Sequence, residues 1–408
     1  IFNRWGMGQS LSSPVTAQRV QRRGCSWLRV GAAEMQGWRA HHEDAHFADL
    51  CWPPPQAVPA ANAGVEHEAG SDVGSQRPAN PPDPNEVVPR SRDAPCRQPQ
   101  GDDGIMDGSG CETSEDRETG GLFIVCDGHG GCDAAQLAVR LLPTCLEARG
   151  GLTSSDGAVK QAFVDCDSWL RRTEIRSGAT CVAATVQQVQ GRFKVRLMNC
   201  GDSRALLVFR HGVAYAETKD HRPSDDDEKG RIERAGGFVS GALCPRVDGV
   251  LALSRALGDF SFKDQHLPVS ERKVSCVPDV YELFCDSGDL IVLGCDGVFD
   301  VLSSEDLART LRSLPLDADL GAVAAQLVRS CVHSRDNVTL MLIMVGVDGS
   351  SFERQDELLA GNWEKETDET VVAHYASFAK LVGGDQCRLV KPPPEVSMLD
   401  AVKAFFDF

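Results

Sequence analysis

The chain has 408 residues, of which 42% are hydrophobic and 25% charged, and its formal net charge at pH 7 is −17. This length can supply one large domain or two smaller ones with a sizeable hydrophobic core. The acidic balance argues against nucleic acid as a partner, because nucleic-acid binding needs a basic surface.

Sixteen cysteines are scattered singly along the sequence and form no Cys-x-x-Cys pair. Several of them, such as Cys126, Cys200 and Cys295, stand inside apolar runs, where cysteine acts as a small hydrophobic residue. This pattern favours a reducing compartment over a disulfide framework or a zinc site. No apolar run reaches the length of a membrane span and no secretory signal is present, so we expect a cytoplasmic or nuclear protein.

Residues 1–24 are predicted to be a flexible tail. Within it, Met7-Gly8-Gln9-Ser10-Leu11-Ser12 matches the N-myristoylation pattern, provided that translation starts at Met7, and Gly8 would then be acylated. The alternative is a chance Met-Gly pair in a flexible segment. A single acyl chain would give only reversible contact with a membrane, which would make the protein a peripheral membrane protein.

From about Cys25 the sequence has strand character, and the run ends in Arg39-Ala40-His41-His42-Glu43-Asp44. Residues 51–120 then hold about half of the 21 prolines, an acidic excess and almost no large apolar residues. Such a segment cannot bury enough surface to offset its ordering entropy. We therefore predict a disordered, low-complexity insertion within the domain.

Beyond the insertion, apolar runs and turn residues alternate at short intervals. The strand over 123–126 runs into Asp127-Gly128-His129-Gly130-Gly131, a turn that is rich in glycine. The remaining pattern predicts strands over 181–186, 193–198, 205–209, 290–295 and 338–345, and helices over 132–146, 159–170, 225–235 and 320–332.

A C-terminal extension with short helices is predicted over residues 349–408. Val371, Val372, Tyr375, Phe378 and Val382 keep helical spacing, and a second short helix is predicted to begin at a serine cap, Ser397. Each helix could dock on the main domain or bind a partner. We expect docking, because packing into a core is the commoner fate of an apolar stripe.

Acidic residues recur at the ends of the predicted strands. Asp127 and Asp296 each follow a buried strand and precede a glycine. Asp336 comes just before a strand, and Glu43 and Asp44 follow a strand-like run. If the strand after Asp336 runs antiparallel to the other two, these carboxylates gather at one sheet edge. Crowded carboxylates need protons or cations to neutralise them, and a ligand set made only of oxygens suits Mg2+ or Mn2+.

At this point the sequence resembles the metal-dependent protein serine/threonine phosphatases of the PP2C (PPM) family. The matching stretches occur in family order over roughly 25–347, the insertion excepted. They are Arg39–His46, Asp127–Gly131, Ser177–Thr180, Asn199–Arg204, Asp220–Pro223, Arg231-Ile232, Ala235–Gly237, Leu251–Asp259, Pro278-Asp279, Asp296–Asp300 and Asp336–Thr339.

The resemblance implies an α+β fold, namely a PP2C-like αββα sandwich of two antiparallel β-sheets flanked by helix pairs, in a phosphatase domain over residues 25–348. It also implies two Mg2+ or Mn2+ ions per active site, bridged by Asp127. Glu43 and the carbonyl of Gly128 would complete the protein ligands of one ion. Asp296 and Asp336 would complete those of the other.

Three more carboxylates gain roles from the resemblance. Asp44 would orient metal-bound waters from behind the ligands. Asp202 and Asp300 match family positions that hold a third, weaker metal. His42 departs from the pattern, because an apolar residue commonly precedes the Glu-Asp pair; we do not assign it as a ligand.

The implied chemistry is hydrolysis of phosphoserine and phosphothreonine in phosphoprotein substrates by a monomeric enzyme. A water or hydroxide bridging the two ions would attack phosphorus directly, without a covalent enzyme intermediate. Arg39 would clamp the phosphate oxygens and His129 would protonate the leaving oxygen. The segment 225–250 matches the flap of the family, which borders the active-site cleft.

Two other readings remain open. A catalytically silent phosphatase fold that serves as a binding scaffold would typically have lost metal carboxylates, whereas this chain keeps each one that aligns. A dinuclear hydrolase of small phosphoesters is the other alternative, and the flap and the open cleft of the family argue for protein substrates instead.

Overall fold

The computed structural model describes residues 10–53, 120–350, 355–383 and 388–390. The predicted acylation at Gly8, residues 54–119 of the predicted insertion and the predicted helix after Ser397 lie outside these residues. The strands that flank the insertion, β3 and β4, are described and pair with each other directly.

Five strands form one antiparallel sheet, in the order β14-β8-β7-β4-β3. They are β3 (Ala45–Trp52), β4 (Gly120–Cys126), β7 (Cys181–Val189), β8 (Arg192–Cys200) and β14 (Asp279–Cys285). Helices α1 (Asp133–Ala148) and α2 (Asp156–Arg172) cover its outer face. Both helices turn alanines, leucines and cysteines toward this sheet, as their apolar spacing predicts.

In the described part of the chain, a second sheet has eight strands in the order β10-β9-β15-β16-β2-β1-β17-β18. Neighbouring strands are antiparallel except β17 and β18. The strands are β1 (Ser10–Cys25), β2 (Leu28–Arg39), β9 (Arg204–Val208), β10 (Tyr215–Glu217), β15 (Leu290–Gly294), β16 (Val338–Val345), β17 (Gln355–Leu359) and β18 (Arg388–Val390). Helices α5 (Ser304–Arg312) and α6 (Leu320–Ser330) pack on its outer face.

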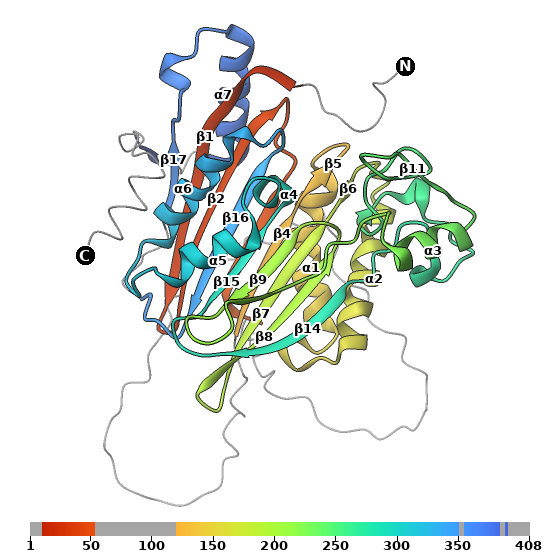
Figure 1. The fold of residues 1–408 in the computed structure, drawn as a ribbon, viewed down its shortest axis with the longest axis horizontal. Coiled ribbons are helices and arrows are strands. Elements are labelled where there is room, and N and C mark those ends of the chain that lie inside the picture. The colour runs from red at the N-terminus through yellow and green to blue at the C-terminus, as the bar shows by residue number, and fades with distance from the viewer. Residues whose placement is uncertain (1–9, 54–119, 351–354, 384–387, 391–408) are drawn as a thin grey trace, which may run out of the picture. The chain divides into compact units, whose positions relative to one another are not determined.

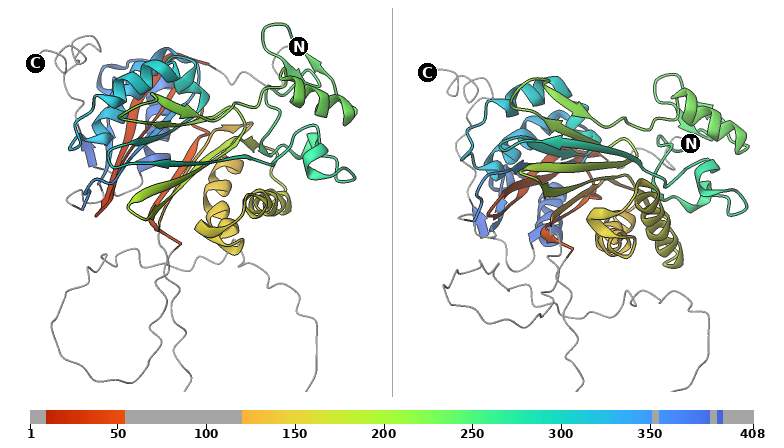
Figure 2. Two further views of the ribbon diagram at one scale, coloured as in Figure 1. Left: turned by 60° about the horizontal axis from the view of Figure 1, so that its bottom comes forward. Right: turned by 90° about the horizontal axis from the view of Figure 1, so that it is seen from below.

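The two sheets pack face to face between the helix layers (Figures 1 and 2). Strand β4 shows how the sequence produces these layers. Phe123 and Val125 point toward the other sheet, whereas Ile124 points toward α1 and α2, and each is fully buried. Each such side chain contributes about 1.5–3 kcal/mol by leaving water. The observed layers confirm the predicted αββα sandwich of the α+β class.

Smaller elements surround one end of the sandwich. Strands β5 (Gly128–His129), β6 (Gly178–Ala179) and β13 (Leu257–Gly258) form a short antiparallel sheet. Helix α3 (Asp226–Arg234) and the hairpin of β11 (Val239–Ser240) and β12 (Arg246–Val247) form the flap. Helix α4 (Asp296–Phe299) begins directly after β15, and 3-10 turns occur at Gly151–Thr153, Phe260–Phe262, Val269–Glu271, Cys331–His333 and Trp363–Lys365.

Two predicted boundaries were wrong. The flexible tail over 1–24 contains β1 from Ser10 onward, because this segment pairs with β2 on one side and β17 on the other. Polar residues such as Gln18 and Gln21, both buried, conceal the strand from a reading of hydrophobicity alone. The insertion also begins later and ends earlier than predicted, since Cys51 and Trp52 belong to β3 and Gly120 to β4.

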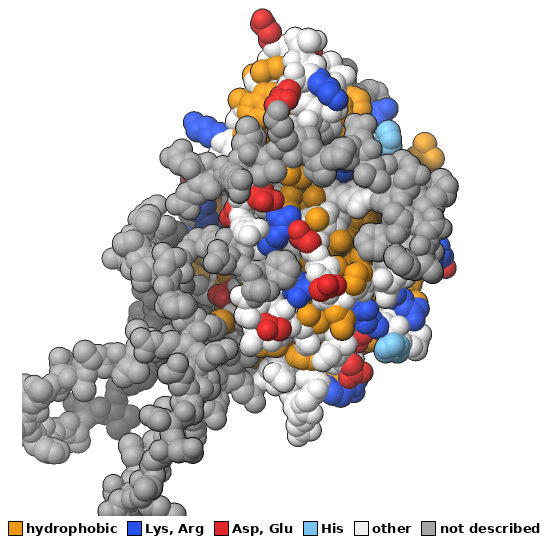
Figure 3. Space-filling view, turned by 90° about the vertical axis from the view of Figure 1, so that its left-hand side faces the viewer, with side chains coloured by type: hydrophobic (Ala, Val, Ile, Leu, Met, Phe, Trp, Pro, Cys, Tyr) orange, Lys and Arg blue, Asp and Glu red, His pale blue; other side chains and the backbone are white. Residues whose placement is uncertain are grey.

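Part of the C-terminal extension adds to the sandwich. Helix α7 (Glu369–Gly383) packs on β1 and β17 and buries Val371, Tyr375, Phe378 and Val382, four of the residues whose helical spacing indicated a docked helix. On the face where β1 and β17 lie, acidic and basic side chains are interspersed (Figure 3). Ion pairs of Arg22 with Asp319 and Glu357 tie β1 to α6 and β17 there.

Among the helices of the described residues, none is long and apolar enough to span a membrane.

Candidate active site

Pairs of strand ends bring the predicted carboxylates together. The end of β4 lies beside the start of β3, where Cys126 pairs with Ala45, so Asp127 meets the segment that carries Glu43 and Asp44. The end of β15 likewise lies beside the start of β16, which brings Asp296 close to Asp336. A side chain at Gly128 would collide with the backbone of Glu43, since a Cβ there would lie 2.3 Å from the Glu43 carbonyl oxygen.

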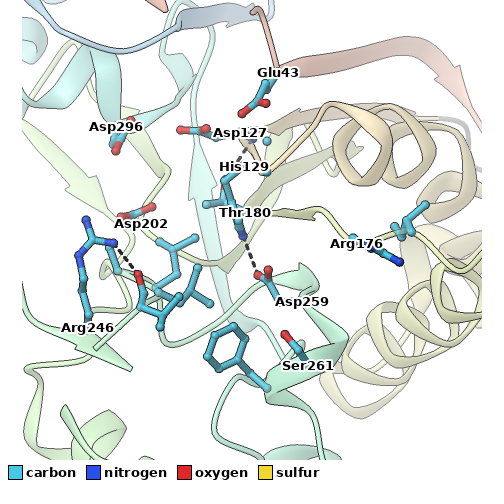
Figure 4. A pocket seen from close by; sticks show the side chains of 18 of the residues that line it. Glu43, Asp127, His129, Arg176, Thr180, Asp202, Arg246, Asp259, Ser261 and Asp296 are labelled. Carbon is cyan, nitrogen blue, oxygen red and sulfur yellow. Dashed lines mark hydrogen bonds and ion pairs between the residues drawn. The ribbon is translucent and has the colours of Figure 1, made fainter. Parts of the chain in front are cut away.

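A cavity of about 1010 Å³ opens at this end of the sandwich (Figure 4). The site residues predicted from the sequence that line it are Arg39, Glu43, Asp127, Gly128, His129, Asp202, Asp296 and Asp336. Asp44 is buried behind the wall, where its Oδ2 accepts a 2.7 Å hydrogen bond from Thr339. Asp300 is exposed and follows α4, outside the lining.

Asp127 and Asp296 form the centre of the cluster. Among the described residues, they and Cys295 are the one group of three potential ligands whose atoms lie within 4.8 Å of one another. Loss of hydration raises the pKa of both carboxyl groups well above its usual value, and the charges of Asp202 and Asp336 raise it further. Without a cation, these carboxylates therefore tend to hold protons.

The donor atoms fit a hard divalent cation. Oδ1 of Asp44 and Oδ1 of Asp296 are buried and have no hydrogen-bond partner within the described part of the chain. Burial raises the pKa of Cys295 well above its usual value, so its sulfur is a thiol, and it donates to the Asn337 carbonyl at 3.5 Å. The ligands on offer are thus oxygens, as Mg2+ and Mn2+ prefer.

Asp336 is partly engaged by the chain itself. Its carboxylate accepts a hydrogen bond from the Arg39 guanidinium and another, at 2.8 Å, from the backbone amide of Asn337. Burial raises the pKa of Asp336 to about 6 even though the charge of Arg39 lowers it. Arg39 is held by the Arg335 carbonyl as well, at 3.0 Å from Nε. The guanidinium therefore lies in the cavity wall next to the carboxylates.

Asp202 extends the cluster toward the flap. It follows Gly201 in the turn between β8 and β9, and Figure 4 shows its carboxylate facing Asp296. Burial and the neighbouring Asp220 raise the pKa of Asp202 to about 7. Desolvation also raises the pKa of Asp300, whose charge acts on Asp296.

His129 has a partner that the sequence analysis did not assign. Its Nε2 lies 2.6 Å from Oδ2 of Asp259. Although desolvation lowers the pKa of His129, Asp259 raises it above the usual value. The short sheet β13-β6-β5 creates this pair, and it needs glycine at its centre: a Cβ at Gly178 would lie 2.2 Å from Asp259 Oδ2 and 2.4 Å from His129 Nε2. Asp259 ends the family motif Leu251–Asp259, which is the sequence signal that could have identified it.

The flap supplies the other wall of the cavity. Val250, Leu251 and Leu253, which follow the flap hairpin, line the cavity together with Phe260, and Arg246 donates to the Val250 carbonyl at 2.6 Å. The flap is fastened by the buried Glu228, which accepts from Arg255 at 2.8 Å and pairs with Arg231 at 2.8 Å. Burial raises the pKa of Glu228, but these two arginines lower it to about 2. An apolar wall thus faces the carboxylates across the cavity.

Comparison with known proteins agrees with this geometry. The family model described as "Protein phosphatase 2C" matches residues 96–338. The chain is 32% identical to human protein phosphatase 1B over 83% of its own length and 61% of the relative's, and 34% identical to mouse "Probable protein phosphatase 1N" over 82% and 70%. A phosphatase crystal structure from Toxoplasma gondii shares the fold, with a TM-score of 0.58, 23% identity, and coverage of 84% of this chain and 99% of that one.

The family model and these relatives define the class of protein as protein phosphatase. Family model and relatives agree, and both matches include the segments that carry Asp127, His129 and Asp296. The chain belongs to the protein phosphatase 2C family.

Proposed function

We propose that this protein hydrolyses phosphoserine and phosphothreonine in phosphoproteins by direct attack of water, with the help of two divalent ions. The observation that carries the proposal is one cavity in which crowded carboxylates, including Asp296 with its unpartnered Oδ1, lie beside an arginine and a histidine whose pKa is raised by Asp259. The chain spans 61% of the length of the human relative, and the substrates of the whole protein are therefore proposed here.

The residues that would hold the ions are Glu43, Asp127, the Gly128 carbonyl, Asp296 and Asp336, with Asp202 and Asp300 beside a weaker third site. When bound, two Mg2+ or Mn2+ ions would supply a water of lowered pKa as the nucleophile and would neutralise charge on the phosphate. Asp44, held by Thr339, would orient water from behind the ligands. The ions would also release Asp127 and Asp296 from the protons that crowding imposes on them.

Arg39 and His129 act on the substrate. The planar guanidinium of Arg39 binds phosphate oxygens, which compete with Asp336 for the same donors. Asp259 accepts from Nε2 of the protonated His129, which leaves the Nδ1 proton for transfer to the departing serine or threonine oxygen. The apolar flap wall and the size of the cavity favour a peptide over a small phosphoester.

Metal removal gives the first prediction. Hydrolysis of a phosphothreonine peptide should require Mn2+ or Mg2+, stop with EDTA, and return when excess Mn2+ is added. Calorimetric titration of Mn2+ into the metal-free protein should show binding without any substrate. The binding itself is expected because each ion relieves the mutual repulsion of the carboxylates that raises the pKa of Asp127 and Asp296.

The two readouts separate the competing functions. Mn2+ binding without turnover of any phosphopeptide would support the scaffold reading. Turnover of p-nitrophenyl phosphate with no turnover of phosphopeptides would support a hydrolase of small phosphoesters. Peptide turnover that survives EDTA would contradict the proposed mechanism.

A pH profile gives the second prediction. Asp259 raises the pKa of His129, so the protonated form persists until the pH rises through this elevated value. Asp259→Asn removes the carboxylate charge, lowers the pKa of His129, and should move the alkaline limb of kcat/KM to lower pH. Asp264→Asn, an exposed loop substitution, is the control. An unchanged alkaline limb in Asp259→Asn would contradict the role given to this pair.

A further inference from the structure

His42 and helix α7 are not used by the mechanism above, and they contact each other. His42 lies in the loop between β2 and β3, next to Glu43, and is only 4% exposed. The ring of Phe378 meets the His42 ring edge to face, with centroids 5.2 Å apart and planes at 88°. One turn earlier in α7, His374 meets His41 with centroids 6.3 Å apart. The C-terminal helix therefore touches two consecutive residues that precede the carboxylates.

The loop is fixed on its other side by the sandwich. Asn337 accepts from the backbone amide of Glu43 at 2.9 Å and donates to the His41 carbonyl at 3.0 Å. Thr339 donates to Asp44 at 2.7 Å. On the side of α7, the His42 ring has Nε2 at 3.4 Å from Glu34, while its Nδ1 has no hydrogen-bond partner among the residues described. Packing against Phe378 therefore adds to one long polar contact in positioning this ring.

Helix α7 is itself anchored to β1. The hydroxyl of Tyr375 lies 3.0 Å from the Thr16 amide and 2.9 Å from its Oγ1, and donates to the Pro14 carbonyl at 3.2 Å. Trp363 stacks on Tyr375 with centroids 5.7 Å apart. Val371 and Val382 join Val15 of β1 in the same apolar cluster. These contacts fix α7 on β1, so the helix can hold the loop in position.

We propose that α7 is a positioning element for the metal site. By holding His41 and His42, the docked helix keeps Glu43 and Asp44 where a cation needs them, so that docking of α7 and cation binding stabilise each other. The inference rests on the proposed function, since it concerns the affinity of the same carboxylates. Because the effect passes through the loop, Phe378 and His374 act as positioning residues and touch no substrate.

The test compares two truncations within one helix of the full-length protein. Phe378→Ala removes the contact with His42, whereas Val371→Ala trims the same apolar cluster without touching the loop. Calorimetric titration of Mn2+ into the metal-free proteins should show affinity about tenfold weaker for Phe378→Ala and within about twofold of wild type for Val371→Ala. Both substitutions should lower the melting midpoint, because both leave a cavity.

Two further variants test whether weaker Mn2+ binding merely reflects a loss of stability. Phe378→Leu preserves most of the packing and should keep the melting midpoint close to that of wild type, yet still weaken Mn2+ binding severalfold. His42→Ala should weaken binding as well, and adding Phe378→Ala to it should change nothing further, because both substitutions remove one contact.

Some outcomes would overturn the inference. Equal Mn2+ affinity in Phe378→Ala and wild type would do so, as would equal losses in Phe378→Ala and Val371→Ala, or additive losses in the double variant. A wild-type protein that binds no Mn2+ would instead contradict the proposed function, so the two failures can be told apart.

Discussion

Asp127→Asn is expected to lower the turnover of a phosphothreonine peptide by at least about a thousandfold, equivalent to about 4 kcal/mol of transition-state stabilisation. Asp127 lies at the centre of the cluster, within 4.8 Å of Asp296 through its ligand oxygen. An amide oxygen is a weaker ligand than a carboxylate and brings no negative charge, so a site that relies on Asp127 for both ions should lose them. Steady-state kinetics at saturating Mn2+ measures the effect.

Asp127→Asn should lose turnover but should not lose thermal stability in the metal-free protein. The pKa of Asp127 in the folded, metal-free protein lies well above its usual value, so its stabilising form is the protonated one and its contribution is lost as the pH rises through that value. At neutral pH, above the usual pKa of the carboxyl group, Asp127 therefore lowers the stability of the metal-free fold, whether it takes up a proton or is buried as a charge. Asp127→Asn should melt at or above the temperature of wild type without metal, and Mn2+ should raise the melting midpoint of wild type alone.

A matched substitution separates local from general effects. Asp286 precedes the opposite end of β15 and forms an exposed ion pair with Arg192. Asp286→Asn should keep near wild-type turnover and the same stabilisation by Mn2+. If Asp127→Asn kept more than about a tenth of the wild-type rate, the bridging role would be excluded, because loss of a bridging ligand costs several kcal/mol.

The layers of the fold could be predicted because the hydrophobic pattern of the central strands is visible in their own sequences. β4 and β15 are apolar throughout and β16 is apolar except for Thr339, and glycine, aspartate or asparagine lies at or next to the site end of each strand. Both the strand type and the position of the carboxylates therefore follow from periodicity and turn chemistry. Strand β1 could not be predicted this way. It carries five polar or charged residues over Gln18–Arg23 and is stabilised by neighbours that lie far away in sequence.

Site residues that lie within sequence motifs could be predicted, whereas contacts between segments far apart in the sequence could not. The carboxylates, Arg39 and His129 lie inside motifs that are readable from the sequence. The pair of His129 and Asp259 spans 130 residues and is joined by two-residue strands, which have no periodicity to detect. The anchoring of α7 by Tyr375 and Thr16 spans 359 residues. Helical spacing predicted that α7 would be amphipathic, but not which strand would cover its apolar face.

His129→Gln is expected to lower the turnover of a phosphothreonine peptide by about a hundredfold to ten-thousandfold, the usual contribution of a positioned general acid. The threonine oxygen leaves as a strongly basic alkoxide unless it receives a proton. Asp259 raises the pKa of His129 and so favours its protonated form, whereas glutamine fills a similar space without an acidic proton. Because the alkaline limb of the wild-type profile reports the loss of that proton, Asp259→Asn should move this limb and His129→Gln should abolish it.

A second substrate shows that the proton is what matters. p-Nitrophenolate is a good leaving group that needs no protonation, so His129→Gln should lose no more than about tenfold with p-nitrophenyl phosphate at saturating Mn2+. His211→Gln, at an exposed histidine in the turn after β9, should match wild type on both substrates. Equal losses on the two substrates would mean that His129 supports the carboxylates or the phosphate instead of the leaving group. A loss confined to the peptide would leave proton donation as the explanation, because cation binding and phosphate binding are common to both reactions.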